Sequence, residues 1–334
     1  MLEYKEIGDG LKICRILNGM WQVSGSHGYI DSTKAVQNML DYHNFGFTSW
    51  DLADIYGPAE LFVGKFRKSL ESVKGKEELK NTQALTKFVP NPGPMTKNIV
   101  THNIKNSMER MGVDCLDLIQ FHWWDYNDPN YIDALTHLSD LCNEKKIRNI
   151  GLTNFDTERL KLITDHGIKI VSNQIQFSIL DSRPHEKMIP FCLKNRISVL
   201  AYGVLLGGFL SENYLGAPEP NRGVLTTASL QKYYKIIKVW GGWALFQELL
   251  QTLSQISKKH DCGIANVATS FILEKPAVAG VIIGTRLGIS DHKEENSKVF
   301  NVHLDSDDKS LIKHVTAKSH NLISIIGDCG SEYR

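Results

Sequence analysis

Four side chains that can handle a proton stand at points where an apolar run gives way to polar sequence. They are Asp51, Tyr56, Lys87 and His122. A phenol such as Tyr56 is a poor acid near neutral pH, because its ordinary pKa is about 10. A lysine ammonium beside it would favour the phenolate and lower that pKa, and a carboxylate would hold the lysine in place and keep it charged. With His122 donating from its ring to a substrate oxygen, the four groups predict a site that protonates a carbonyl oxygen as negative charge develops there.

Each of these residues also has an ordinary structural explanation. Lys87 could be a surface residue whose ammonium reaches water, and His122 a structural histidine with satisfied hydrogen bonds. Tyr56 could be a core ring with a wet hydroxyl, and Asp51 could cap the turn that follows it. Suitable residue types at or just after the ends of three consecutive predicted strands favour a common site.

The elements that must position these residues alternate regularly along the chain. Apolar runs predict strands at 15–22, 47–51, 83–87, 115–122, 147–152, 170–176, 198–202 and 279–284. Apolar residues at helical spacing predict helices at 32–45, 60–70, 96–111, 131–146, 157–166, 186–195, 246–256 and 266–273. Ser32 and Thr33 are expected to cap the first helix and Gly46 to end it. Residues 7–14 predict a hairpin, and residues 305–321 a further helix.

Residues 207–243 interrupt this rhythm with glycines, two prolines and a run of aromatic side chains. Long ordered loops are usually functional lids or disordered spacers, and the aromatics favour a lid. We expect it to carry a helical piece near 229–239. The aromatic residues that it would add to the wall of the site are Tyr214, Tyr233, Tyr234, Trp240 and Trp243.

About eight strand-helix units predict a parallel sheet that closes into a (β/α)8 TIM barrel. The hairpin would precede the barrel, the long loop would follow the seventh strand, and the extra helix would pack outside. We expect one domain over residues 1–334, with its core at about 13–302. The ends of barrel strands meet at one mouth, where residues far apart in sequence come together. The alternative, an open doubly wound sheet, would normally carry a G-x-G-x-x-G turn after its first strand, and the sequence has none.

Composition narrows the class of protein further. The 334 residues are 42% hydrophobic and carry a formal net charge of +1, so no field would attract nucleic acid or an anionic membrane. The sequence shows no signal segment and no membrane-spanning run, which predicts a cytoplasmic protein. Six scattered cysteines without a C-x-x-C pair predict reduced thiols, with no disulfide framework and no metal site.

From about residue 13 to about residue 302, the sequence resembles the aldo/keto reductases. The most specific motifs are DLADIYGPAE at 51–60, TK at 86–87, FH at 121–122, GLTNF at 151–155 and SNQ at 172–174. The resemblance implies a catalytic tetrad on a TIM barrel that binds a nicotinamide dinucleotide, usually NADP with NAD possible, without a Rossmann fold. By this resemblance, Tyr56 is the acid in reduction and the base in oxidation. Lys87 and Asp51 would tune it, and His122 would orient the carbonyl.

The same resemblance implies where the cofactor binds. Asn154 and Gln174 match positions that bind the nicotinamide carboxamide, and Tyr202 matches the aromatic that stacks on that ring. Thr153 stands where the family often has serine. The full set of implied cofactor residues is Trp21, Thr153, Asn154, Gln174, Tyr202, Gly203, Leu205, Gly207, Gly284, Thr285, Arg286, Glu295 and Asn296. Of these, the glycine loop at 203–207 would drape over the pyrophosphate, and residues 283–286 and 295–296 would hold the adenosine end.

The adenosine end departs from the family pattern. About two extra residues separate Gly284 from Glu295, and His292-Lys293 stands where a second arginine is often found. Arg286 suits a 2'-phosphate, because guanidinium and phosphate pair in bidentate geometry. Residues 291–295 could equally be a solvated charge run. In the same way, Asn154 could cap the helix that starts at 157, and Tyr202 could simply fill core.

The predicted function is NADP-dependent reduction of an aldehyde or ketone. Trp21, Trp123 and Trp124 are expected to line the substrate pocket, which suits an apolar, aromatic or sugar body. One alternative is a sugar or alcohol dehydrogenase of the same family, and another is a nicotinamide-binding regulatory subunit. A barrel hydrolase using Asp51 and Asp54 is disfavoured, because odd spacing on an extended chain points the two side chains apart. Fold-level analogy fixes neither the substrate nor the oligomeric state.

Overall fold

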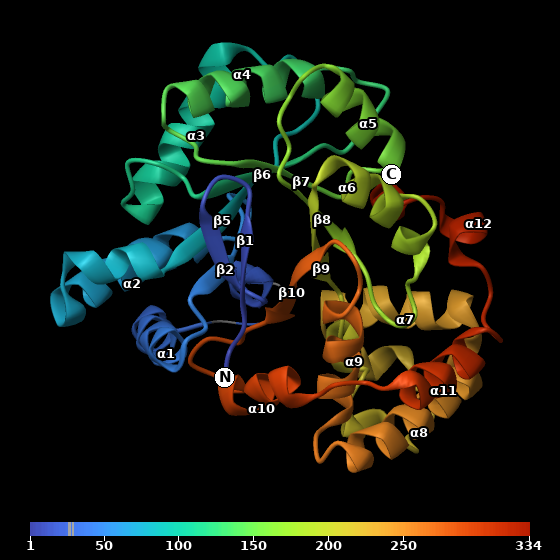
Figure 1. The fold of residues 1–334 in the computed structure, drawn as a ribbon. Helices are drawn as coiled ribbons and strands as arrows, with labels where there is room; N and C mark the ends of the chain where they lie inside the picture. Colours follow the sequence, from blue (N-terminus) through green and yellow to red (C-terminus); the bar gives the residue numbers. More distant parts are fainter. Residues whose placement is uncertain (26–27, 29) are drawn as a thin grey trace.

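Eight parallel strands close into a barrel at the centre of the molecule (Figure 1). The computed structural model describes residues 1–25, 28 and 30–334. Around the barrel the strands follow the order β10-β3-β4-β5-β6-β7-β8-β9. They are β3 (Ile16–Gly19), β4 (Ser49–Asp51), β5 (Gln83–Phe88), β6 (Leu118–His122), β7 (Ile150–Thr153), β8 (Ser172–Gln176), β9 (Ser198–Tyr202) and β10 (Val278–Gly284). The predicted TIM barrel is therefore confirmed, and the open sheet is wrong.

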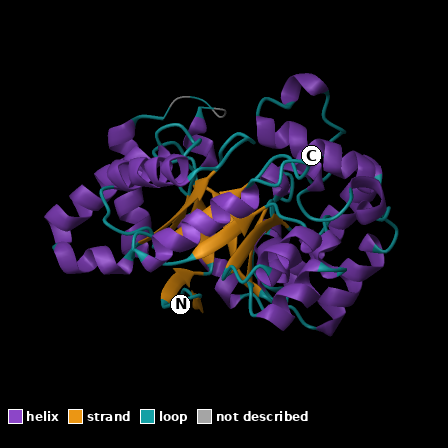
Figure 2. Ribbon diagram, turned by 90° about the horizontal axis from the view of Figure 1, so that it is seen from above, coloured by secondary structure: helices purple, strands orange, loops and turns teal. Residues whose placement is uncertain are grey.

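Helices surround the barrel and bury their apolar faces against it (Figure 2). Those between successive strands are α1 (Ser32–Phe45), α2 (Ala59–Lys74), α3 (Lys97–Met111), α4 (Tyr131–Asn143), α5 (Thr157–Asp165) and α6 (Met188–Asn195). α1 ends at Gly46 with φ 111°, as predicted, because a left-handed residue is needed there. Its cap was predicted one residue late: Asp31 accepts hydrogen bonds from the amides of Thr33 and Lys34.

A two-stranded hairpin closes one end of the barrel. β1 (Tyr4–Ile7) and β2 (Leu11–Cys14) pair antiparallel, which confirms the predicted hairpin. Ile7, Leu11 and Ile13 pack against apolar side chains that point into the barrel from its strands, among them Leu85 and Leu118. Substrate and cofactor must therefore use the other end, where the strands finish.

The long insertion between β9 and β10 builds a second hydrophobic cluster. It contains α7 (Ala228–Trp240), α8 (Gly242–Lys259) and α9 (Ile264–Leu273), together with short 3-10 turns at Leu206–Gly208, Glu212–Tyr214 and Arg222–Val224. Trp240 and Trp243 are buried in this cluster with Phe209 and Phe246. The expectation that these tryptophans line the site is wrong, because their side chains are buried in the separate hydrophobic core of the insertion.

After β10, the chain runs along the outside of the barrel, and its last residues return to the barrel. α10 (Lys293–Ser297) is followed by α11 (Ser306–Thr316), the predicted extra helix, which packs on α8. α12 (Leu322–Ile326) and residues 327–334 were not predicted. Figure 2 shows the chain starting on one side of the strands and finishing on the other, near the carboxyl ends of the strands.

Two findings bear on the composition. The six cysteines, all among the described residues, are free thiols, as predicted. In the described part of the chain, we find no helix with the length and apolar character that crossing a membrane requires.

Candidate active site

The strand ends bring the four predicted proton-handling residues to one mouth of the barrel. Asp51 and His122 are the last residues of β4 and β6, and Lys87 is the last but one of β5. Tyr56 lies in the loop between β4 and α2. Lys87 Nζ lies 2.8 Å from both carboxylate oxygens of Asp51 and 5.1 Å from the centre of the Tyr56 ring.

The Lys87–Asp51 pair is buried and fully bonded. The ammonium also donates to the carbonyl oxygen of Leu52 at 3.0 Å, so its three N–H groups have acceptors. Asp51 Oδ1 accepts two further hydrogen bonds, from Gln120 Nε2 at 2.9 Å and Gln174 Nε2 at 2.6 Å. A buried ion pair is stable only when its remaining hydrogen-bonding groups are satisfied. The two glutamines therefore hold the carboxylate that holds the lysine.

Gln120 was missed by the sequence analysis, although a signal was present. It is an amide in the middle of the otherwise apolar strand LIQFH, and its side chain is fully buried. Gln174 was expected to bind the nicotinamide carboxamide. Its Nε2 instead donates to Asp51 and to Gln120 Oε1 at 2.7 Å. Because Gln174 Nε2 is engaged in these bonds, a cofactor would be contacted by Gln174 Oε1.

Burial governs the acidity of Tyr56. Loss of water raises the pKa of the phenol well above 10, and repulsion from the Asp51 carboxylate raises it further. The predicted lowering by Lys87 is wrong for this structure. The ammonium gives its N–H groups to Asp51 and Leu52, and the neighbouring carboxylate offsets its charge. Tyr56 is therefore a neutral hydrogen donor throughout the physiological pH range.

His122 is held by the neighbouring strand. Its Nδ1 lies 3.0 Å from the carbonyl oxygen of Thr153, which can only accept, so Nδ1 carries a hydrogen. Burial, aided by the positive charges of Arg334 and Lys87, lowers the pKa of the ring to about 4, although the hydrogen bond to Thr153 acts in the opposite direction. A neutral ring that donates from Nδ1 presents a lone pair at Nε2. Donation to a substrate oxygen therefore needs a second proton or a rotated ring.

This low pKa predicts a pH-dependent contribution to stability. The unfolded ring takes up a proton below about 6.5, whereas the folded ring does so only near 4. The contribution of neutral His122 is thus present above pH 6.5 and is lost as pH falls toward 4, by about 3 kcal/mol at most. Urea unfolding of the wild type and His122→Gln at pH 7 and pH 4.5 should show the larger loss in the wild type. Asp54, whose burial raises its pKa to about 6, titrates in both proteins, so its effect cancels in the comparison. Losses of equal size in the two proteins would therefore contradict the assignment to His122.

Three predicted cofactor residues lie beside the tetrad. The Trp21 ring meets the Tyr56 ring edge-on at 5.0 Å. Thr153 Oγ1 is buried and has no hydrogen-bond partner among the described residues. Asn154 does not cap α5, since Asp156 does, and its Oδ1 lies 2.7 Å from the Tyr202 hydroxyl. The orphaned hydroxyl of Thr153 fits a polar ligand such as a carboxamide, because a buried hydroxyl without a partner is costly.

The glycine loop after β9 is shaped by packing. Gly203 and Gly207 have φ of 74° and 67°, which favours glycine. A Cβ on Gly203 would lie 2.6 Å from the Tyr233 hydroxyl, so the loop rests directly on α7. Leu205, between them, is half-buried against both apolar clusters. The contact of this loop with pyrophosphate stays a prediction.

The residues predicted for the adenosine end lie around β10 and α10. Gly284 ends β10, and Thr285 bonds to the carbonyl oxygen of Gly19 through both its amide and its hydroxyl. Arg286 is exposed. Glu295 lines an open cleft of about 370 Å³ with Glu212, Gly263 and Lys298. Asn296 lies in the same short helix as Glu295.

The departure at 291–295 has a structural counterpart. Lys293 pairs with Asp291, so the residue nearest to the missing second arginine already has a carboxylate partner. This pairing is what the alternative of a solvated charge run expects. Arg286 is then the cation best placed in sequence to meet a 2'-phosphate.

The predicted substrate tryptophans separate. Trp123 is fully buried against Phe121, and its Nε1 donates to the carbonyl oxygen of Asp128, so it belongs to the core and its assignment to the pocket is wrong. Trp124 is 37% exposed, and its ring meets the His122 ring edge-on at 4.3 Å. Trp21 and Trp124 therefore remain as candidate walls of the pocket.

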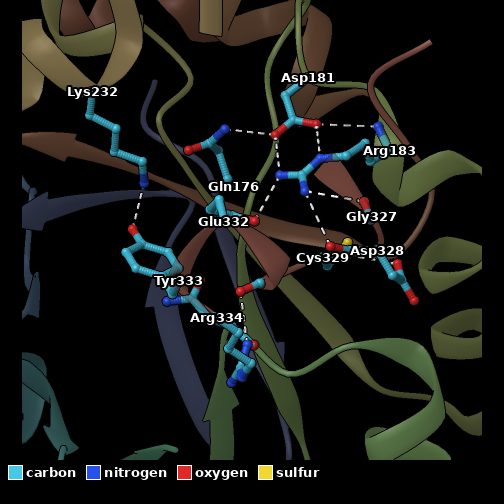
Figure 3. Close-up of polar contacts among 12 residues, drawn as sticks. Gln176, Asp181, Arg183, Lys232, Gly327, Asp328, Cys329, Glu332, Tyr333 and Arg334 are labelled. Atoms are coloured by element: carbon cyan, nitrogen blue, oxygen red, sulfur yellow. Dashed lines mark hydrogen bonds and ion pairs between the residues drawn. The ribbon is translucent and has the colours of Figure 1, made fainter. Parts of the chain in front are cut away.

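A group of charged and aromatic residues at the mouth was missed. Figure 3 shows Arg183, which Asp181 holds, and Lys232 joined to residues 327–334 by hydrogen bonds and an ion pair. The charged tripeptide DSR at 181–183, just after β8, was the available signal.

A barrel with a neutral phenol, a buried ammonium and an imidazole at its mouth defines a class of site that can protonate a carbonyl oxygen. A family model described as the aldo/keto reductase family matches residues 15–317. The chain belongs to the aldo/keto reductase family. It is therefore an oxidoreductase that uses a nicotinamide cofactor to act on carbonyl compounds.

Similar proteins fall in the same family. An NADH-specific methylglyoxal reductase of Escherichia coli is 24% identical over 330 residues, which cover 91% of this chain and 95% of that protein. Flagellar radial spoke protein 5 of Chlamydomonas reinhardtii is 34% identical over 163 residues, 43% of this chain and only 31% of that protein. Among solved structures, the glycerol dehydrogenase AKR11B4 of Gluconobacter oxydans superposes with a TM-score of 0.76 at 19% identity, over 94% of this chain and 95% of that chain. At this identity, the structural likeness concerns the fold.

Proposed function

We propose that this protein reduces a small aldehyde or ketone to an alcohol and that Tyr56 gives the proton. The observation that carries the proposal is the half-buried, neutral phenol beside the bonded Lys87–Asp51 pair. The bound nicotinamide supplies the hydride. As negative charge develops on the carbonyl oxygen, Tyr56 donates its proton to that oxygen. His122 and Trp124 form the wall against which the carbonyl group is oriented.

The protonated form of Tyr56 is the form that reduction needs. A phenol whose pKa is raised stays protonated, which suits an acid that protonates a forming alkoxide. Oxidation of an alcohol needs the phenolate as a base, and burial disfavours that form. The curated relatives named methylglyoxal reductase and L-glyceraldehyde 3-phosphate reductase support the same direction and point to small oxygenated carbonyl compounds.

A two-way assay tests this proposal. Small aldehydes and ketones with NADPH or NADH, and the matching alcohols with NADP or NAD, should be compared on the same sample between pH 6 and pH 9. We expect reduction to dominate, with at least one carbonyl compound turned over. Faster oxidation of alcohols or sugars would favour the dehydrogenase, and cofactor binding without any turnover would favour the regulatory subunit.

We further propose a preference for NADP, with NAD as the alternative, on the basis of the exposed Arg286 after β10. Arg286→Ala should weaken NADPH binding about tenfold or more and leave NADH binding nearly unchanged, because a guanidinium–phosphate pair contributes about 1.5–3 kcal/mol. Fluorescence titration with both cofactors measures this. Arg196→Ala, an exposed arginine just before β9 at the hairpin end of the barrel, is the matched control. Equal weakening for both cofactors would contradict the 2'-phosphate role.

The remaining alternatives differ in what the site can offer. A hydrolase would need Asp51 free, but its carboxylate is engaged by Lys87, Gln120 and Gln174. We also propose that residues 1–334 act as one domain on small molecules in the cytoplasm, where six free thiols would stay reduced.

A further inference from the structure

Residues 327–334 return from α12 to the mouth of the barrel and lie among the proposed cofactor and substrate residues (Figure 3). We call them the returning segment. It begins at the amino end of α5, where Asp328 Oδ2 accepts from the amide of Thr157 at 3.0 Å. From there it crosses the ends of β6, β7 and β9, as the contacts of its side chains show.

Arg183 is the anchor of the returning segment. Its guanidinium is held by Asp181 at 2.8 Å, and both side chains are almost fully buried. The same guanidinium donates to the carbonyl oxygens of Gly327 and Asp328, and its Nη2 lies 2.9 Å from Glu332 Oε2. The Glu332 side chain is only 7% exposed. A buried, charge-assisted contact of this kind is stronger than an ordinary surface ion pair.

The segment contacts the hydroxyl of Tyr202, whose ring is expected to stack on nicotinamide. The Tyr202 hydroxyl lies 3.3 Å from Glu332 Oε1 and 3.2 Å from the Tyr333 hydroxyl. Lys232, from α7, places its ammonium 5.0 Å from the centre of the Tyr202 ring and 4.4 Å from that of Tyr333. Its Nζ also donates to the Tyr333 hydroxyl at 2.5 Å. An ammonium and a phenol thus occupy the vicinity of the Tyr202 ring.

The segment also reaches the catalytic end of the mouth. The Tyr333 ring lies 6.1 Å from the His122 ring and 6.4 Å from the Trp124 ring. Arg334 donates to the carbonyl oxygens of Asn154 at 2.8 Å and Trp123 at 2.5 Å. A carbonyl substrate that lies against His122 and Trp124 would have to displace these side chains.

One glycine allows the segment to lie so close. Gly330 has φ 84°, and a Cβ there would stand 1.9 Å from the carbonyl oxygen of Asn154. That distance is far below any real contact, and the obstacle is backbone at the end of β7, which cannot turn aside. Any side chain at 330 must therefore lift the segment from the mouth.

We infer that residues 327–334 and the nicotinamide end of the cofactor compete for the barrel mouth, so that the chain carries its own competitive inhibitor. The inference rests on the proposed function, because it takes Tyr202 and Asn154 as cofactor residues. The Lys232 ammonium, which bonds to Tyr333 of the segment, lies over the Tyr202 ring, so it and a nicotinamide cannot occupy that face together. If the segment is docked most of the time, the apparent dissociation constant for the cofactor rises by the ratio of docked to free protein.

Gly330→Ala in the full chain tests the competition. Gly112→Ala is the matched control, since Gly112 also has a left-handed backbone, with φ 64°, but nothing lies within 4 Å of its Cβ position. NADPH titration by fluorescence should give binding about tenfold or more tighter for Gly330→Ala than for the wild type, with the control unchanged. Glu332→Gln, which keeps the shape but removes the ion pair with Arg183, should tighten binding in the same direction.

Hydrogen exchange gives an independent readout. The amides of Ser331 and Tyr333 bond within the segment, to the carbonyl oxygens of Asp328 and Gly330. Saturating NADPH should speed exchange in peptides covering 327–334 of the wild type. Equal or weaker binding by both variants, or unchanged exchange with NADPH bound, would overturn the competition while leaving the reductase proposal intact. Failure of every protein to bind NADPH or NADH would instead overturn the proposed function and the competition with it.

Discussion

Tyr56→Phe is expected to lower the rate of carbonyl reduction by about 10²–10⁴-fold, because the variant lacks the only proton that the phenol can give. The phenyl ring that remains would keep the edge-on contact with Trp21 and its place beside Lys87. Cofactor binding should therefore change little. Single-turnover oxidation of bound NADPH by an aldehyde separates the two effects, since it reports hydride transfer without product release.

A second tyrosine provides the control for that substitution. Tyr4, in the hairpin at the closed end of the barrel, donates its hydroxyl hydrogen to the carbonyl oxygen of Gly46. The Tyr4→Phe variant should reduce the carbonyl substrate at the wild-type rate. Turnover by Tyr56→Phe at that same rate would mean that the proton comes from elsewhere, and the assignment of Tyr56 would be wrong.

The second large effect is expected at Lys87, and it is an effect on stability as well as on rate. Lys87→Met removes the cation from a carboxylate that is 5% exposed, and the glutamine amides alone do not neutralise its charge. Breaking one side of a buried pair costs about 3–5 kcal/mol. Urea unfolding should show a loss of this size, and carbonyl reduction should fall with it.

Two further variants serve as controls for this prediction. Lys161→Met removes one side of an exposed pair with Asp165 and should leave the unfolding midpoint nearly unchanged. Lys87→Met combined with Asp51→Asn should recover part of the lost stability, because no charge is left unpaired, but should stay inactive. A stable Lys87→Met protein would contradict the buried ion pair.

Strand ends were the part of the site that sequence predicted best. Asp51 and His122 end β4 and β6, and Lys87 stands one residue before the end of β5, because a parallel barrel brings the ends of its strands to one mouth. The period of apolar residues identified these strands, and the closing topology then followed. The four residues could therefore be placed together before any distance was known.

Properties that depend on how deeply a side chain is buried could not be predicted from the sequence in the same way. The pKa of Tyr56 follows from burial, which residue type and spacing do not reveal. Trp123 and Trp124 are adjacent in sequence, yet one is in the core and the other at the mouth, because successive residues leaving a strand point in opposite directions. Trp240 and Trp243 are buried in a second hydrophobic core. The sequence did not predict this core, because the composition of the insertion resembles that of a loop.

The return of residues 327–334 had no periodic signature at all. Its position is set by single long-range contacts, such as Arg183 with Glu332 and Gly330 against Asn154. Contacts of that kind depend on where the chain leaves α12, and no local pattern encodes them. Asn154 and Tyr202, two of the cofactor residues predicted from family resemblance, therefore lie against this other part of the chain.

The most direct test of the central claim follows one deuterium atom from the cofactor into the product. Reduction of an aldehyde with NADPH deuterated at the nicotinamide carbon that gives the hydride should yield an alcohol carrying that deuterium on the former carbonyl carbon, as seen by mass spectrometry. Its hydroxyl hydrogen should come from exchangeable positions. An alcohol without the label, or NADPH that binds and is never consumed in the presence of any carbonyl compound, would contradict the account.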